Sequence, residues 1–186
     1  MTTQAPYQVL FLCTGNSARS IFAEYFLRRL GGRRFKVSSA GSRPNPDGAV
    51  NPLTLKVLRD RFHVDASGAR SKSWDEFREK GVKFDFVITV CDQAREACPV
   101  WPGQPIVAHW GVDDPSAFVG TPQARERFFA QMAMLLYRRI QIFTSLPLEK
   151  LDRLRIAELT RDIGRRTVDE LPGLAAETAE PRSPRE

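Results

Sequence analysis

The chain has 186 residues, of which 42% are hydrophobic and 27% are charged, and its formal net charge is +6. That length and composition suit one globular domain with a substantial core. The sequence has no apolar run near the roughly 20 residues of a membrane span, and its N-terminus lacks the basic region of a secretory signal. We therefore expect a cytoplasmic protein in a reducing compartment, where structural disulfides are rare. The positive charges are scattered, which disfavours nucleic acid or a membrane as the partner and suits a small oxyanion.

Short apolar runs typical of buried parallel strands alternate with longer stretches of helical spacing. The expected strands comprise residues 9–12, 35–40, 84–90 and 105–110. The expected helices comprise residues 17–30, 48–62, 71–77, 121–143 and 148–165. This order is typical of an α/β fold in which helices flank an open, parallel four-stranded sheet. One domain would cover residues 6–165, and the tail over residues 166–186, which has few large apolar residues, is expected to be disordered.

The loop between the first expected strand and the first expected helix predicts an oxyanion site. A loop in this position directs backbone N–H groups and the positive end of a helix dipole toward an anion. Arg19 can bind the anion with its planar guanidinium, and Gly15 would allow close backbone approach. The same field would lower the pKa of Cys13 and make it a nucleophile, to which Ser20 can donate a hydrogen bond. The predicted oxyanion site around Cys13 comprises Thr14, Gly15, Asn16, Ser17, Ala18, Arg19 and Ser20.

Two cysteines and a pair of acids follow later strands of the expected sheet. Cys91 ends the third strand, Asp113-Asp114 follows the fourth, and six residues separate Cys98 from Cys91. Ligands of open α/β sheets bind beyond the carboxyl ends of strands, so we expect these side chains near Cys13. The cysteines could instead be small core residues, and the Asp-Pro pair could open a turn. No metal is expected, because the cysteines and histidines lack the compact spacing of zinc ligands.

Several segments resemble those of arsenate reductases built on the low-molecular-weight tyrosine phosphatase fold. They are CTGNSARS after VLFL, SAGSRPN, RSKSWDEF, VCDQAREACPVWPGQP and AHWGVDDPS, within about residues 7–145. The resemblance implies that Cys13 attacks arsenate and that Asp114 is the general acid, with Asp113 as the alternative. It also implies that Cys91 and Cys98 carry a disulfide away from the loop. The external reductant would be thioredoxin, or glutathione with glutaredoxin, and no tightly bound cofactor is implied.

The closest alternative is a phosphatase of the same fold, acting on phosphotyrosine or a small phosphoester. It would use Cys13, Arg19 and Asp114 through a phosphocysteine and would need no further cysteine. Phosphatase relatives tend to place aromatic residues directly after the Asp-Pro pair, where this chain has Ser116 and Ala117. A sensor that binds arsenite through its thiols without turnover is a further alternative from another class.

The resemblance also extends to a cation site. Asn16, Glu24 and Ser39 match positions that bind a potassium ion in some thioredoxin-coupled relatives. Those relatives carry an acid where this chain has Lys72, and an ammonium group there could take the place of the cation. We therefore expect activity that does not depend on potassium.

Overall fold

The computed structural model describes residues 5–171 and has one parallel sheet in the strand order β2-β1-β3-β4. The strands are β1 (Tyr7–Cys13), β2 (Phe35–Gly41), β3 (Phe86–Thr89) and β4 (Ile106–His109). Residues 9–12 of β1 have no exposed surface, as is typical of a central strand covered on both faces of the sheet. The predicted open, parallel four-stranded sheet is confirmed.

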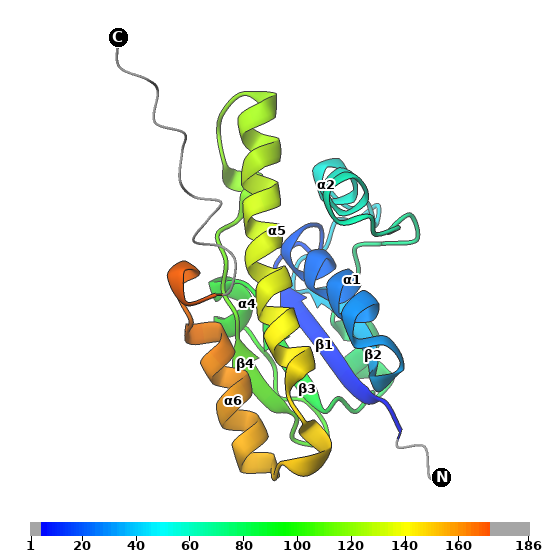
Figure 1. The fold of residues 1–186 in the computed structure, drawn as a ribbon. Helices are drawn as coiled ribbons and strands as arrows, with labels where there is room; N and C mark the ends of the chain where they lie inside the picture. The colour runs from blue at the N-terminus through cyan, green and yellow to red at the C-terminus, as the bar shows by residue number, and fades with distance from the viewer. Residues whose placement is uncertain (1–4, 172–186) are drawn as a thin grey trace.

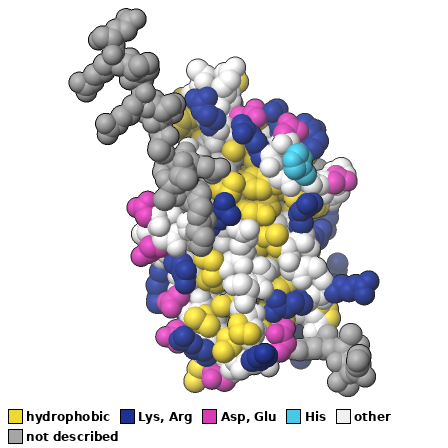
Figure 2. Space-filling view, viewed as in Figure 1, with side chains coloured by type: hydrophobic (Ala, Val, Ile, Leu, Met, Phe, Trp, Pro, Cys, Tyr) yellow, Lys and Arg dark blue, Asp and Glu magenta, His cyan; other side chains and the backbone are white. Residues whose placement is uncertain are grey.

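Helices cover this sheet, and two of them pack together over its centre. The helices are α1 (Arg19–Gly31), α2 (Pro52–Phe62), α3 (Asp75–Glu79), α4 (Asp92–Glu96), α5 (Pro122–Ser145) and α6 (Arg153–Arg165). Figure 1 shows α1 and α5 side by side in front of the sheet, with α6 along β4. Within residues 5–171, no helix is long and apolar enough to cross a membrane. Figure 2 shows Lys and Arg side chains spread over this face among Asp and Glu.

Several helix boundaries differ from the sequence-based expectation. The expected helix over residues 148–165 is divided, because a 3-10 turn ends at Lys150 and Asp152 then caps α6 by accepting the N–H of Arg155 at 2.9 Å. α2 begins only at Pro52, since Asn51 accepts the N–H of Leu53 as its N-cap. α4 was not expected, because five residues are too few to show helical periodicity.

The structure describes the first residues of the segment that was expected to be a disordered tail. Residues 166–171 are described, and Val168–Glu170 forms a 3-10 turn. Leu171 is only 2% exposed and gives this segment an apolar anchor that average composition does not reveal. The remainder of the expected tail, residues 172–186, lies outside the described residues.

An aromatic core fixes the end of β1, from which the loop at Cys13 begins. Phe11 of β1 lies 6.0 Å from Trp110, and Trp110 in turn lies 5.6 Å from Phe143 of α5, between ring centroids. All three rings are fully buried. On α5, Phe129 is fully buried and Phe128 is only partly buried. Phe128 instead stacks on Phe118 at 4.7 Å.

Candidate active site

Cys13 lies at the carboxyl end of β1, with its sulfur enclosed by the loop that follows. It is 2% exposed, and its Sγ lies 2.8 Å from Ser20 Oγ and accepts the backbone N–H of Asn16 at 3.1 Å. α1 begins at Arg19 with Ala18 as its N-cap residue, and no described side chain caps this end. The first turn of α1 also contains no acidic residue. Its N–H groups and dipole are therefore available to an anion in the loop.

Asn16 shapes the loop through its fully engaged side-chain amide. Its backbone has φ 45°, in the left-handed region that Asn tolerates better than most residues. Its Nδ2 donates to Ser20 Oγ and to Ser39 Oγ, both at 2.9 Å. Its Oδ1 accepts the backbone N–H of Lys72 at 2.9 Å. Asn16 therefore links the loop to β2 and to the segment before α3.

The close backbone approach at this site occurs at Gly41, which the sequence analysis did not single out. A Cβ on Gly41 would lie 2.4 Å from Thr14 O and 3.0 Å from Asn16 N, so β2 can end against the loop only with a glycine. Gly15 has no such constraint, because a Cβ added there would lie 3.6 Å from Ser17 Oγ, which is an ordinary van der Waals contact. Ser71, also not singled out, donates its hydroxyl to Gly15 O at 2.8 Å.

Arg19 and Asp114 meet at the rim of the loop. Arg19 Nη2 lies 3.1 Å from Asp114 Oδ2, and Nη1 donates to Val112 O at 3.3 Å. Asp114 also accepts the N–H of Ser116 at 3.0 Å, so the turn interpretation holds alongside the ion pair. The structure gives this ion pair to Asp114 rather than to Asp113, although both residues are exposed.

Cys91 lies beside the loop, at the start of α4. Its Sγ accepts the N–H of Ala94 at 3.4 Å as the N-cap of that helix, and it is 3% exposed. Thr14 Oγ1 lies 3.4 Å from the same sulfur and donates to Gln93 Oε1 at 3.1 Å. A residue of the Cys13 loop therefore contacts the second thiol directly, and Gln93 is a further neighbour that the sequence analysis missed.

Cys98 lies beyond the other end of α4. It is half-buried, its Sγ lies 3.7 Å from Pro99 O, and burial raises the pKa of its thiol. All three cysteines are free thiols. In this state the structure brings Cys91 to the loop and keeps Cys98 one short helix away.

The pKa of the Cys13 thiol differs from the sequence-based expectation. Burial raises this pKa above its ordinary value, and the hydrogen bonds from Ser20 and the charge of Arg19 oppose the effect only in part. The nearby Cys91 raises the pKa further. Desolvation of an enclosed sulfur thus outweighs the positive field in the unliganded loop.

A buried charge cluster supports the loop from the side of β2. Glu24 is 3% exposed and accepts the hydroxyl of Ser39 in a short hydrogen bond. Lys72 Nζ lies 3.6 Å from Glu24 Oε2 and 3.4 Å from Ser39 Oγ, and Arg28 also pairs with Glu24. Burial lowers the pKa of Lys72, and Glu24 raises it in part. A metal cation does not fit among these oxygens, because the ammonium of Lys72 already contacts them.

The polar side-chain atoms of His109 and of the neighbouring Trp110 already have hydrogen-bond partners within the protein. The imidazole of His109 lies between Thr89 Oγ1 at 2.8 Å and Asp92 Oδ1 at 2.9 Å. Trp110 is fully buried and donates to Thr160 O at 2.9 Å. Among residues 5–171, no group of three or more His, Cys, Asp or Glu side chains could hold a metal ion.

A cysteine at the base of an uncapped helix N-terminus, with an arginine and an acid at the rim, is an arrangement that can hold a tetrahedral oxyanion. Residues 8–151 match the family of low molecular weight phosphotyrosine protein phosphatases, and the chain belongs to this family.

Several similar curated proteins are named arsenate reductases. The arsenate reductase of Oceanobacillus iheyensis is 33% identical over 135 residues, which cover 73% of this chain and 93% of that protein. The arsenate reductase of Bacillus subtilis is also 33% identical, with the same coverage of both chains. The resemblance drawn from the motifs is therefore confirmed.

Solved structures show the same fold. The thioredoxin-dependent arsenate reductase of Corynebacterium glutamicum aligns with 30% identity and a TM-score of 0.50 over 75% of this chain. The alignment covers 64% of that protein, which is less than two thirds of its length. Wzb of Vibrio vulnificus, in complex with benzylphosphonate, aligns with a TM-score of 0.60 over 78% of this chain and 99% of that one. At 19% identity, this second likeness shows the fold alone.

Proposed function

We propose that this enzyme reduces arsenate to arsenite through a relay of three thiols, Cys13, Cys91 and Cys98. The observation that carries the proposal is the contact of Thr14 with Cys91, which lies 3.4 Å from the Thr14 hydroxyl and so beside the loop of Cys13. A phosphatase would need only the first thiol. The curated relatives named arsenate reductase supply the substrate of the proposal.

Arsenate would enter the loop against the backbone N–H groups and Arg19. Binding of the oxyanion to Arg19 would release Asp114 from its ion pair and leave this acid beside the substrate. The Cys13 thiolate would then attack arsenic, and a hydroxyl of arsenate would leave as water after taking the proton of Asp114. The product of this step is a Cys13 sulfur bonded to arsenic(V).

Cys91 would attack the Cys13 sulfur in the second step. The electron pair of the sulfur–arsenic bond would pass to arsenic, which leaves as arsenite, while the two thiols are oxidised to a Cys13–Cys91 disulfide. Cys98 would next attack Cys91 and form a Cys91–Cys98 disulfide, which frees Cys13. An external thiol reductant, thioredoxin or glutathione with glutaredoxin, would reduce this last disulfide, so the proposed cycle needs a reducing compartment.

The final exchange requires α4 to unwind. Its five residues alone extend roughly 7 Å at about 1.5 Å per residue, and Cys91 and Cys98 lie beyond its two ends. A disulfide needs Cα atoms within about 7 Å of each other. Since α4 is this short, loss of its few hydrogen bonds is a small cost, and the disulfide would trap the unwound segment.

The test is arsenate-dependent oxidation of an external thiol reductant, supplied either as reduced thioredoxin or as glutathione with glutaredoxin, by the wild-type protein and by Cys91→Ser. We expect turnover by the wild type and none by the variant. Without Cys91, no second thiol would attack the Cys13 sulfur and release arsenic as arsenite. Arsenate reduction that survives Cys91→Ser would contradict the relay. Hydrolysis of a phosphoester by this same variant would reveal the alternative function, since the phosphatase route uses Cys13, Arg19 and Asp114 only.

A further inference from the structure

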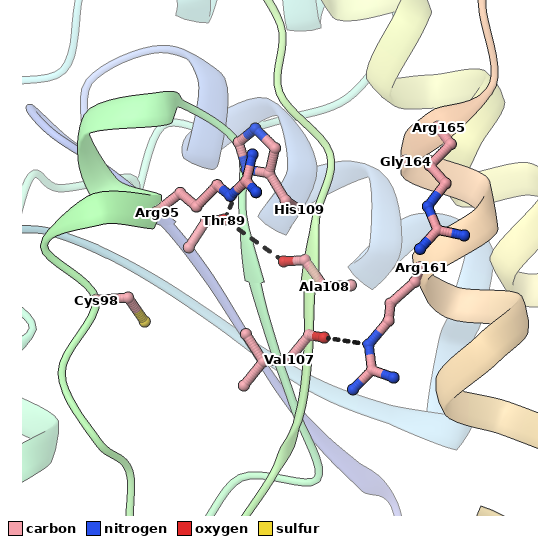
Figure 3. Close-up of a pocket in the computed structure, with 9 residues that line it drawn as sticks. All are labelled: Thr89, Arg95, Cys98, Val107, Ala108, His109, Arg161, Gly164 and Arg165. Atoms are coloured by element: carbon pink, nitrogen blue, oxygen red, sulfur yellow. Dashed lines mark hydrogen bonds between the residues drawn. The ribbon is translucent and has the colours of Figure 1, made fainter. Parts of the chain in front are cut away.

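A cationic pocket lies between α6 and the end of the sheet, and the Cys98 sulfur borders it. Its volume is about 360 Å³, within the range of small-molecule sites. Arg95 of α4 lines one side, and Arg161 and Arg165 of α6 line the other (Figure 3). The lining includes no Asp or Glu side chain.

The two arginines of α6 face the pocket together, because positions four apart lie on one face of a helix. Figure 3 shows the guanidinium of Arg161 directed from α6 toward Val107 of β4, while the side chain of Arg165 runs alongside α6. Arg161 donates Nε to Val107 O at 3.2 Å, which fixes its orientation. Arg165 pairs with Asp162 at 3.0 Å on the exposed surface.

The remaining charged groups around the pocket leave it positive. His109 lines it but is held between Thr89 and Asp92. Arg139 lies behind it and donates to Trp110 O at 2.8 Å. Arg95, Arg161 and Arg165 thus all line the pocket, and the ion pair of Arg165 with Asp162 offsets one of these three charges.

α6 is held firmly against β4, so the wall of the pocket that α6 and β4 form is a fixed part of the fold. A Cβ on Gly164 would lie 1.9 Å from His109 O, which shows how closely the helix backbone approaches the strand. Trp110 donates its indole N–H to Thr160 O of the same helix at 2.9 Å. α6 begins at Arg153, beyond the residues that match the family, so the pocket combines a family element with a segment outside that match.

We propose that this pocket binds a small thiol with two carboxylates, of the glutathione class, which reduces the enzyme at Cys98. The proposal rests on the thiol relay and names its reductant. Paired carboxylates suit arginines on opposite walls, since guanidinium groups bind carboxylates bidentately. The half-buried sulfur within a concave pocket suits a small molecule better than the flat surface of a protein reductant.

The exchange would use two molecules of the thiol. The first thiolate attacks Cys98 Sγ of the Cys91–Cys98 disulfide, so that Cys91 leaves as a thiolate and takes up a proton. The second attacks the small-molecule sulfur of the mixed disulfide and releases Cys98. Two small thiols are oxidised to one disulfide while the protein disulfide is reduced to two thiols.

The first test measures binding without redox chemistry. S-methylglutathione carries both carboxylates and no free thiol, and calorimetry with the reduced full-length chain would give its affinity. We expect saturable binding that weakens by about tenfold or more in Arg161→Gln/Arg165→Gln, since each lost charge-assisted contact has that order of effect. Arg155→Gln, on the exposed side of the same helix, should bind like the wild type. Absence of binding, or equal binding by the double variant, would overturn the proposal.

The second test measures reduction of the preformed Cys91–Cys98 disulfide. The rate with glutathione should fall by about tenfold in the double variant, while the rate with uncharged 2-mercaptoethanol should be unchanged. If thioredoxin alone reduced the disulfide and the arginine variants slowed it, the pocket would belong to a protein reductant and our proposal would be wrong. Neither test needs arsenate. If both gave the expected results but the enzyme did not turn over arsenate, the proposed function would be rejected and the proposed thiol-binding pocket would stand.

Discussion

Arg19 and Asp114 form an ion pair that joins the loop after β1 to the loop after β4, with 3.1 Å between Nη2 and Oδ2. In the proposed function, the substrate and the acid would share this one guanidinium. An oxyanion that binds Arg19 would then lie beside Asp114 at the rim.

The first prediction concerns this acid. Asp114→Asn keeps a good capping side chain for the turn at Ser116 but removes the transferable proton. Single-turnover formation of arsenite should slow by roughly a hundredfold to ten-thousandfold. Asp113→Asn, at the exposed neighbouring position, is the matched control and should stay near the wild-type rate. Equal rates for the two variants would remove Asp114 from the mechanism.

Ser20 provides a prediction on pH dependence. Its hydroxyl lowers the pKa of Cys13 against the larger effect of burial, so Ser20→Ala should raise that pKa further. The thiolate is the deprotonated form, so alkylation of Cys13 by iodoacetamide should rise with pH, with its midpoint moved upward in the variant. Mass spectrometry of the peptide that contains Cys13 separates it from the other two thiols. An unchanged or lower midpoint would contradict the role of the hydroxyl.

Lys72 gives a prediction on stability and on cation dependence. Wild-type turnover should be equal in potassium and in tetramethylammonium salts of the same ionic strength, because Lys72 already contacts Glu24 and Ser39. Lys72→Met should lower the free energy of unfolding in urea by roughly 1–3 kcal/mol, since it removes one of the two cations that pair with a buried carboxylate. Lys36→Met, at an exposed position of β2, should have little effect. Potassium-stimulated turnover of the wild type would refute this account.

The docking of α6 can be tested at Gly164. Gly164→Ala would place a methyl group 1.9 Å from His109 O, so the helix must shift and lose contact with β4. We expect a loss of roughly 1–3 kcal/mol in the free energy of unfolding. Gly68→Ala is the control, since nothing lies within 4 Å of a Cβ there. Similar stability of the two variants would show that the approach of helix to strand is not tight.

The sequence predicted the central strand of the sheet because residues 9–12 form a continuous apolar run, and these residues are buried throughout. It did not reveal α4, whose five residues are too short for a periodic signal. It also missed the burial of Leu171, since that depends on a tertiary contact rather than on the composition of the tail.

At the site, the loop at Cys13 could be predicted because strand, loop and helix signals are adjacent in the chain. The direction of the shift in the Cys13 pKa could not be predicted. It depends on how deeply the folded chain buries the sulfur, because the effect of burial on the pKa exceeds that of the opposing hydrogen bonds. Gly41 was missed because its constraint is a contact with Thr14 and Asn16, which no local pattern shows. The separation of Cys98 from the loop likewise follows from α4, which was not predicted.

The most direct test of the three-thiol relay is disulfide mapping after one turnover with arsenate, in the absence of any external reductant. Peptide mass spectrometry should find the Cys91–Cys98 disulfide in the wild type, and the Cys13–Cys91 disulfide in Cys98→Ser, where the last exchange is blocked. Arsenite released from wild-type protein that keeps Cys91 and Cys98 as free thiols would contradict the relay.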